Sequence, residues 1–258
     1  MEEFKNKVVV VTGSASGIGK AIVSHLLKLE AKIVAVDINH ELLSQLMKDE
    51  SSNRYRLVVA DICNSKDRSR ILMEACQLGQ PTYLVNAAGI VGMKNIFNVT
   101  EENWDRIQNV NAKACFFMCQ LFAKYWVEQG IKGSIVNFSS SAGKTSATSE
   151  NAAYSASKAS VISITKSFAY ALASAGCRVN CVCPGIILTP MSETVLNQLS
   201  DERGVMKEEI ATNRLKTVPM GREGTPEEVV KVVLFLLSED ASYMTGQSIN
   251  ITGGLVMN

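Results

Sequence analysis

The sequence predicts an α/β protein in which helices cover both faces of a parallel β-sheet, a doubly wound arrangement. Short runs rich in valine and isoleucine alternate with helical patterns along all 258 residues. These runs are continuously apolar, as at 8–11, which indicates strands that are buried on both faces. Because strands and helices alternate, we expect right-handed crossovers and parallel strands. No repeat or linker divides the chain, so residues 1–258 are expected to form a single domain.

The individual elements follow from this alternation. Strands are expected at 7–12, 32–37, 55–60, 82–86, 134–138, 177–183 and 247–251. Helices are expected at 18–30, 41–50, 65–78, 101–129, 152–175 and 226–238.

The stretch 189–224 interrupts the pattern because it contains no strand signal. Two amphipathic pieces, around 191–199 and 203–216, carry apolar residues among charges. A long insertion at the carboxyl edge of an open α/β sheet is well placed to cover a ligand. We therefore expect a helical lid over 189–224; the alternative is a helical hairpin that only packs on the core.

Composition gives no sign of a nucleic-acid-binding, membrane or secreted protein. The net charge is +1, and the hydrophobic and charged fractions of 47% and 20% are ordinary for a globular protein. The N-terminus lacks the pattern of a signal peptide, and the apolar stretch 229–237 is too short to span a bilayer. We expect a cytoplasmic protein without nucleic-acid or membrane partners.

Seven cysteines are scattered along the chain, at 63, 76, 115, 119, 177, 181 and 183. This spacing does not resemble a disulfide framework and indicates a reducing setting. Cys181 and Cys183 share one face of an expected strand, but the histidines, His25 and His40, are far away in sequence. We therefore expect buried thiols and no metal site.

A glycine-rich turn joins the first strand to the first helix. Glycines permit a tight turn and close approach of backbone N–H groups to a pyrophosphate, and the helix N-terminus adds partial positive charge. The spacing G-x3-G-x-G differs from the usual dinucleotide fingerprint, and a plain turn is the alternative. The cofactor contacts expected here are Gly13, Ser16, Gly17, Ile18 and Gly19.

An acidic residue ends the second strand. Asp37 follows Gly19 by 18 residues, close to the spacing of ~20 at which a carboxylate binds the adenosine ribose. It can accept hydrogen bonds from both ribose hydroxyls and would repel a 2′-phosphate, and positions 38 and 39 carry no Arg or Lys. NAD is therefore favoured over NADP as the cofactor. The alternative role, capping the helix that starts near His40, suits Asn39 better.

Polar and small residues end the next two strands. Asp61 and Ile62 follow the third strand and are expected at the adenine, with capping of the next helix as the alternative for Asp61. Small residues after the fourth strand let the backbone pass close to the cofactor, and an asparagine there can tie strand ends together. These expected contacts are Asn86, Ala87, Ala88 and Gly89.

Tyr154 and Lys158 are four residues apart in an expected helix, so they lie on one face. A phenol has a pKa of roughly 10 and is a poor base near neutral pH. A neighbouring ammonium stabilises the phenolate and lowers that pKa. An exposed helix with a solvated lysine is the alternative, because such pairs occur often by chance.

Taken together, these motifs resemble the short-chain dehydrogenase/reductase family over essentially the whole chain. The matching segments are 12–19, Asp61, 86–89, Asn111, 137–140, Tyr154 with Lys158, 180–185, 243–247 and 253–254. The resemblance implies a Rossmann-type domain with a seven-stranded parallel sheet, a nicotinamide dinucleotide and a homotetramer or homodimer. Thr252 departs from the family, in which many members have Asp before the two glycines; we expect this to affect packing.

The resemblance also implies a role for each site residue. Tyr154 corresponds to the general acid/base, and Lys158 to the residue that lowers its pKa and holds the nicotinamide ribose. Asn111 corresponds to the asparagine that anchors a water of the proton relay. The family motif places the catalytic serine at Ser140, whereas the usual spacing to the tyrosine points to Ser141; we prefer Ser140. The segment expected to fix the carboxamide contains Pro184, Gly185, Ile187 and Thr189.

The function expected is therefore that of an NAD-dependent oxidoreductase that interconverts a secondary alcohol and a ketone. The segment before Tyr154 is polar, which favours a small polyol, sugar or hydroxy acid as substrate. Lys144 can pair with a substrate carboxylate or phosphate, or be a solvated loop lysine. The polar residues of this segment are Ser141, Lys144, Thr148, Ser149 and Asn151.

Two alternatives remain at this point. A 3-oxoacyl-thioester reductase fits the same motifs, but its usual preference for NADP conflicts with Asp37. A non-catalytic dinucleotide sensor or scaffold would be expected to lose the tyrosine or the lysine, and both are present.

Overall fold

The computed structural model describes residues 2–46, 53–146 and 148–258 and contains a seven-stranded parallel sheet in the order β3-β2-β1-β4-β5-β6-β7. The strands are β1 (Val8–Thr12), β2 (Lys32–Asp37), β3 (Tyr55–Val59), β4 (Pro81–Asn86), β5 (Ser134–Phe138), β6 (Arg178–Pro184) and β7 (Ser248–Ile251). The strand order reverses beside β1, as in doubly wound folds. The predicted fold class is confirmed.

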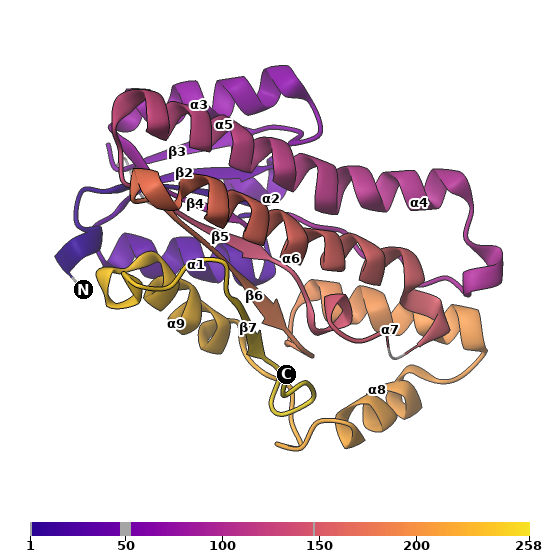
Figure 1. The fold of residues 1–258 in the computed structure, drawn as a ribbon. Coiled ribbons are helices and arrows are strands. Elements are labelled where there is room, and N and C mark those ends of the chain that lie inside the picture. Colours follow the sequence, from indigo (N-terminus) through magenta and orange to yellow (C-terminus); the bar gives the residue numbers. More distant parts are fainter. Residues whose placement is uncertain (1, 47–52, 147) are drawn as a thin grey trace.

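Helices cover both faces of the sheet (Figure 1). One face carries α1 (Gly17–Lys28) and α9 (Pro226–Leu237), and the other carries α3 (Ser65–Leu78), α5 (Ala114–Gln129) and α6 (Ala152–Leu172). Val9 and Val11 of β1 join the core on the first face, whereas Val8 and Val10 join the core on the second. The uninterrupted valine run thus has the predicted cause, since successive side chains are buried on opposite faces.

The expected helix at 101–129 is divided. It consists of α4 (Glu101–Gln108), a π-helical turn (Asn109–Lys113) and α5. A π-helical turn inserts an extra residue into the helix, and it places Asn111 where its side chain bonds the backbone of Ile90. Hydrophobic periodicity alone does not reveal this insertion.

The expected helix at 41–50 is described only in part. The structure shows α2 (His40–Ser44), and residues 47–50 lie outside the described residues. Asn39 caps α2 by accepting a hydrogen bond from the Leu42 N–H (3.0 Å), as expected.

The stretch 189–224 contains two helices, α7 (Pro190–Arg203) and α8 (Lys207–Lys216). A short parallel bridge joins Ile187 to Gly224, and the Leu188 N–H donates to the Gly224 carbonyl (2.9 Å). The two ends of the segment therefore meet beside the sheet. The helices α7 and α8 lie between these ends in the sequence.

Five cysteines are buried, including Cys181 and Cys183 in β6 as expected, and Cys63 and Cys76 are exposed. Both lie outside the strands, Cys63 before α3 and Cys76 on its outer side. In the described ranges, His, Cys, Asp and Glu form no group of three or more that could hold a metal.

Trp126 is the largest fully buried side chain among the described residues. Its indole N–H donates to the Pro81 carbonyl (2.7 Å), which fixes the ring beside the start of β4. A Cβ built on Gly133 would lie 2.3 Å from this ring. Gly133 therefore lets the chain pass the indole on its way into β5.

We expect Gly133→Ala to lower the free energy of unfolding by about 1–3 kcal/mol, because the added methyl overpacks the core at Trp126. Urea unfolding followed by circular dichroism measures this change. In a Trp126→Leu background, the same substitution should have a smaller effect. Equal effects in both backgrounds would contradict the proposed contact.

Candidate active site

A cavity of about 870 Å³ opens at the carboxyl ends of the central strands and continues beneath α7 and α8. Nearly all predicted site residues lie in its wall. Those that do are Gly13, Ser16, Gly17, Ile18, Gly19, Asp37, Asp61, Ile62, Ala87, Ala88, Gly89, Ser140, Tyr154, Lys158, Pro184, Gly185, Ile187 and Thr189. The predicted residues Asn86 and Asn111 do not line it.

The glycine turn is shaped by close backbone contacts. Gly13 has a φ of 65°, and a Cβ there would lie 2.7 Å from the Ala88 Cα. A Cβ on Gly19 would lie 2.0 Å from the Gly13 carbonyl oxygen. Ser16 caps α1 without a side-chain hydrogen bond, so the first N–H groups of the helix keep their capacity to bind an anion. This cradle of backbone fits a pyrophosphate.

Asp37 lies next to this turn and is held by the backbone. One carboxylate oxygen accepts from the Ala15 N–H (3.0 Å) and the other from the Asn39 N–H (2.9 Å). The carboxylate therefore has a fixed position at the end of β2, on the wall of the cavity.

Asp61 lies at the same end of the cavity. Its side chain accepts from the Cys63 N–H (2.8 Å), while α3 is capped by Asn64, which accepts from the Lys66 N–H (2.8 Å). The alternative that Asp61 caps this helix is therefore wrong.

The Asn86 side chain turns away from the cavity, and the expected cofactor contact of this residue stays a prediction. Its amide donates to the Asn137 side-chain oxygen (2.9 Å), and the Asn137 amide donates in turn to the Thr165 hydroxyl (3.0 Å). Asn86 does tie β4 to β5, as expected, and the chain of hydrogen bonds continues to α6. The alternation of side chains along β4 places Asn86 on the face covered by α5 and α6.

Asn111 is 2% exposed and lies behind the cavity wall. Its amide oxygen accepts from the Ile90 N–H (2.8 Å), and its amide nitrogen donates to the Ile90 carbonyl and the Ser157 hydroxyl (both 2.9 Å). A Cβ on Gly89 would lie 3.3 Å from the Asn111 oxygen and 3.2 Å from the Lys158 ammonium. Both polar groups therefore lie close to Gly89, on the side where another residue would carry its side chain. The expected water-anchoring role stays a prediction.

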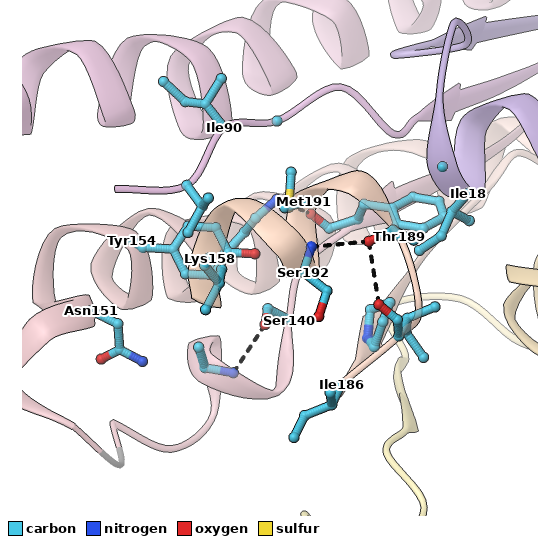
Figure 2. Close-up of a pocket in the computed structure, with 18 of the residues that line it drawn as sticks. Ile18, Ile90, Ser140, Asn151, Tyr154, Lys158, Ile186, Thr189, Met191 and Ser192 are labelled. Carbon is cyan, nitrogen blue, oxygen red and sulfur yellow. Dashed lines mark hydrogen bonds between the residues drawn. The ribbon is translucent and has the colours of Figure 1, made fainter. Parts of the chain in front are cut away.

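Ser140, Tyr154 and Lys158 lie together on the wall, at the end of β5 and on the first turns of α6 (Figure 2). The Lys158 ammonium donates to the Phe138 carbonyl (2.8 Å) and lies 5.7 Å from the centre of the Tyr154 ring. Ser140, rather than Ser141, lies close enough to the Tyr154 hydroxyl for its side chain to act on the pKa of Tyr154. Of the two serines, the structure therefore pairs Ser140 with the tyrosine.

Burial dominates the titration of this pair. It lowers the pKa of Lys158 to about 8 and raises the pKa of Tyr154 above its ordinary value, although the Ser140 side chain acts against that rise. The Lys158 ammonium is directed at the Phe138 carbonyl, and the expected lowering of the Tyr154 pKa by Lys158 stays a prediction. Both residues carry a desolvation penalty in this site.

The segment after β6 lies opposite the tyrosine. The Gly185 N–H donates to the Ile251 carbonyl (2.9 Å), which keeps this segment against β7. The Thr189 hydroxyl accepts from the Ser192 N–H (3.3 Å) and caps α7. Pro184, Ile187 and their neighbours thus form the wall where the sheet gives way to α7.

The helices α7 and α8 pack directly over the tyrosine. A small apolar cluster joins Val91, Val195, Leu199 and Ile210, and Tyr154 packs against it. Hydrogen bonds also fix α7 to the loop after β4. The Met93 N–H donates to Gln198 and the Asn95 N–H to Glu202 (both 2.9 Å).

Several wall residues are absent from the sequence predictions. Arg203 and Arg214 line the cavity from α7 and α8. Arg203 pairs with Glu150 (2.8 Å), on the turn before α6. The amphipathic pattern of 191–199 and 203–216 indicates which positions are apolar, but it does not reveal which charged residues face inward.

Lys144 does not line the cavity, so both roles considered for it are wrong. Its ammonium donates to the carbonyl oxygens of Ser248 (2.9 Å) and Asn258 (3.0 Å). It therefore fastens the loop after β5 to the C-terminal segment.

The comparisons with known proteins agree with this geometry. A family model described as enoyl-(acyl carrier protein) reductase matches residues 13–256. The 3-oxoacyl-[acyl-carrier-protein] reductase of Thermotoga maritima is 40% identical over 98% of this chain and 99% of its own length. The (3R)-3-hydroxyacyl-CoA dehydrogenase of Rattus norvegicus is 33% identical over 98% of both chains. The chain belongs to the short-chain dehydrogenase/reductase family.

A solved structure extends the match to three dimensions. 4-Hydroxyisoleucine dehydrogenase complexed with NADH has a TM-score of 0.86 and 29% identity, covering 97% of this chain and 99% of that one. The protein is thus a short-chain oxidoreductase of the class that acts on secondary alcohols and ketones. No helix of the described residues combines the length and apolar character needed to cross a membrane.

Replacing the buried lysine of this short-chain dehydrogenase/reductase should change how its stability depends on pH. Lys158 titrates near pH 8 in the folded protein against 10.5 ordinarily. The unfolded state therefore binds more protons between these values, and wild-type stability rises with pH there. From pH 7.5 to 9.5, we expect the free energy of unfolding of wild type to gain about 1–2 kcal/mol relative to Lys158→Met.

Chemical denaturation at several pH values measures this difference. Lys207→Met, at an exposed lysine that begins α8, is the matched control and should follow wild type at every pH. Parallel curves for wild type and Lys158→Met would contradict the lowered pKa.

Proposed function

We propose that the protein is an NAD-preferring oxidoreductase that interconverts a secondary alcohol and a ketone on a small polar substrate, with Tyr154 as the general acid/base. The observation that carries this proposal is the shared cavity. Ser140, Tyr154 and Lys158 line it at one end, and the glycine turn and Asp37 line it at the other. A dinucleotide and a small alcohol can therefore be held side by side.

The protein's own groups supply the proton chemistry. The Ser140 hydroxyl donates a hydrogen bond to the substrate oxygen, which stabilises negative charge on it. The Tyr154 hydroxyl gives a proton to that oxygen during reduction, and the Tyr154 phenolate accepts a proton from the substrate hydroxyl during oxidation. The Lys158 ammonium favours the phenolate once a bound ligand completes the site. When bound, the nicotinamide cofactor supplies or accepts the hydride.

The preference for NAD is supported by the charges at the ribose end. Asp37 and Asp61 line this end, and a carboxylate there binds ribose hydroxyls and repels a 2′-phosphate. The cations that line the cavity among the described residues are Lys158, Arg203 and Arg214, which lie on α6 and on the 189–224 segment. The NADH in the complex of 4-hydroxyisoleucine dehydrogenase is consistent with this preference.

We propose that 189–224 acts as a lid over the substrate end. The wall formed by α7 and α8 is apolar at Val195, Leu199 and Ile210, whereas the opposite wall carries Ser141 and Thr148. Such a mixed wall suits a short alcohol with polar substituents. The whole chain, 1–258, is proposed to be one catalytic domain.

A 3-oxoacyl-thioester reductase is the second candidate. It is favoured by the names of the Thermotoga maritima and Rattus norvegicus relatives, which refer to acyl-carrier and coenzyme A thioesters. Oxidation of free alcohols with NAD supports the first function, and faster reduction of 3-oxobutanoyl-CoA with NADPH supports the second.

We also propose that the protein forms a homotetramer or homodimer and that it is located in the cytoplasm. Light scattering on the purified protein measures the assembly. A single-protomer mass would contradict it.

We expect Tyr154→Phe to lower kcat for alcohol oxidation by 10²- to 10⁴-fold, because the proton acceptor is lost. NADH binding, followed by fluorescence, should change less than threefold. Tyr170→Phe is the matched control, since Tyr170 lies on the same helix and is 91% exposed. Equal turnover by wild type and Tyr154→Phe would refute the acid/base assignment.

Combining Asp37→Ala with Ile38→Arg should shift the ratio of kcat/KM for NAD over NADP by at least about tenfold toward NADP. The change removes the repelling carboxylate and adds a cation for the 2′-phosphate. Glu41→Ala, at an exposed residue of α2, should leave the ratio unchanged. An unaltered ratio in the double variant would remove the basis for NAD.

A further inference from the structure

Arg214 lies on the face of α8 that is turned toward the active site. Ile210, Asn213, Arg214 and Thr217 are spaced at three and four residues, and all four line the cavity. Ile210 belongs to the apolar cluster against which Tyr154 packs. Arg214 is the next residue along that face, one helical turn of about 5.4 Å farther on.

The guanidinium of Arg214 has no partner among the described residues. It is partly buried, and neither a hydrogen bond nor an ion pair joins its side chain to a residue of the described ranges. Burial lowers its pKa, the charge of Glu223 raises it and the charge of Arg203 lowers it. Glu223 acts on Arg214 through its charge but forms no hydrogen bond or ion pair with it among the described residues. The partly desolvated guanidinium in the cavity wall therefore keeps its hydrogen-bonding capacity for an anion that arrives from outside.

The other charges on this wall leave Arg214 available. Arg203 is engaged by Glu150. Glu209, which also lines the cavity, is exposed and forms no ion pair with either arginine in the part of the chain that the structure describes. Lys144, the cation that the sequence offered for a substrate anion, is held by backbone carbonyls elsewhere.

A second polar group of the cavity wall also lacks a partner. Asn151 is 9% exposed, and its amide oxygen is buried without a hydrogen-bond partner among the described residues. It lies three residues before Tyr154, and both residues line the cavity. A buried amide without a partner is unusual, and in a ligand cavity it indicates a polar ligand. This oxygen can accept a hydrogen bond from a hydroxyl of the ligand.

We propose that Arg214 binds a carboxylate of the substrate, with Asn151 as an additional hydrogen-bonding group, and that the alcohol is therefore a short hydroxy acid rather than a polyol or a sugar. A guanidinium matches a carboxylate with two parallel hydrogen bonds, which gives both affinity and orientation. This orientation leaves the hydroxyl end of the substrate for Tyr154. The inference rests on the proposed oxidoreductase function.

Binding to the enzyme–NADH complex tests this assignment without requiring turnover, because an alcohol and NADH form a dead-end complex. Two pairs of probes share a carbon chain and differ in the carboxylate: 3-hydroxybutanoate with butane-1,3-diol, and 4-hydroxypentanoate with pentane-1,4-diol. Calorimetry should show at least one hydroxy acid binding wild type tenfold or more tightly than its diol. Arg214→Gln should weaken binding of that acid by about 10- to 100-fold and change binding of the diol less than threefold.

Two further variants exclude a merely structural effect. Arg214→Lys keeps the positive charge and should retain part of the preference for the acid. Lys207→Gln, which removes an exposed cation from the same helix, should keep all of it. Equal binding of acid and diol by wild type, or an unchanged preference in Arg214→Gln, overturns the assignment. So does tighter binding of 3-hydroxybutanoyl-CoA that is insensitive to Arg214→Gln.

Failure of the proposed function gives a different result. NADH would bind, and no acid, diol or thioester would yield NADH from NAD with the wild-type enzyme. The calorimetric comparison of acid and diol would still report on Arg214. Loss of both probes in Arg214→Gln together with a lowered melting temperature assigns Arg214 to folding and overturns the carboxylate site.

Discussion

The attachment of α6 to the end of β5 is the constraint on which the active site depends. The Ser139 hydroxyl donates to the Lys158 carbonyl (2.8 Å), and the Lys158 ammonium donates to the Phe138 carbonyl (2.8 Å). These two bonds run between the same two elements and fix both the height and the rotation of the helix. Tyr154 is one turn away on the same face, so its position follows from theirs.

This attachment makes the site polar where the rest of the core is apolar. Ser157 accepts from Asn111, and Asn137 connects β5 to Thr165 and to Asn86. Fully bonded networks of this kind specify one arrangement of strands and helix. Lys158 and Tyr154 are desolvated within that frame, and the frame keeps them from moving toward water. The ionisation of Lys158 and Tyr154 therefore depends on which molecules enter the cavity.

Sequence patterns predicted the features that are determined by residues close together in the chain. The valine runs gave the strands, the glycine turn gave the start of α1, and the spacing of Tyr154 and Lys158 gave a shared helix face. The direction of Asn86 and the partners of Lys144 were not predicted, because both depend on contacts with residues far away in the chain. Arg214 was missed for the same reason. An amphipathic helix shows an apolar face in its sequence, but packing decides which flanking charge is enclosed.

The bridge between Ile187 and Gly224 has a consequence for how such a protein can diversify. Because the segment leaves and returns at one place, its length and sequence can change without altering the spacing of β6 and β7. The strands continue to position the proton-transferring groups, and the inserted helices determine which molecules reach them. Exchange of this cassette between related enzymes is therefore a natural route to a new substrate range on an unchanged catalytic frame.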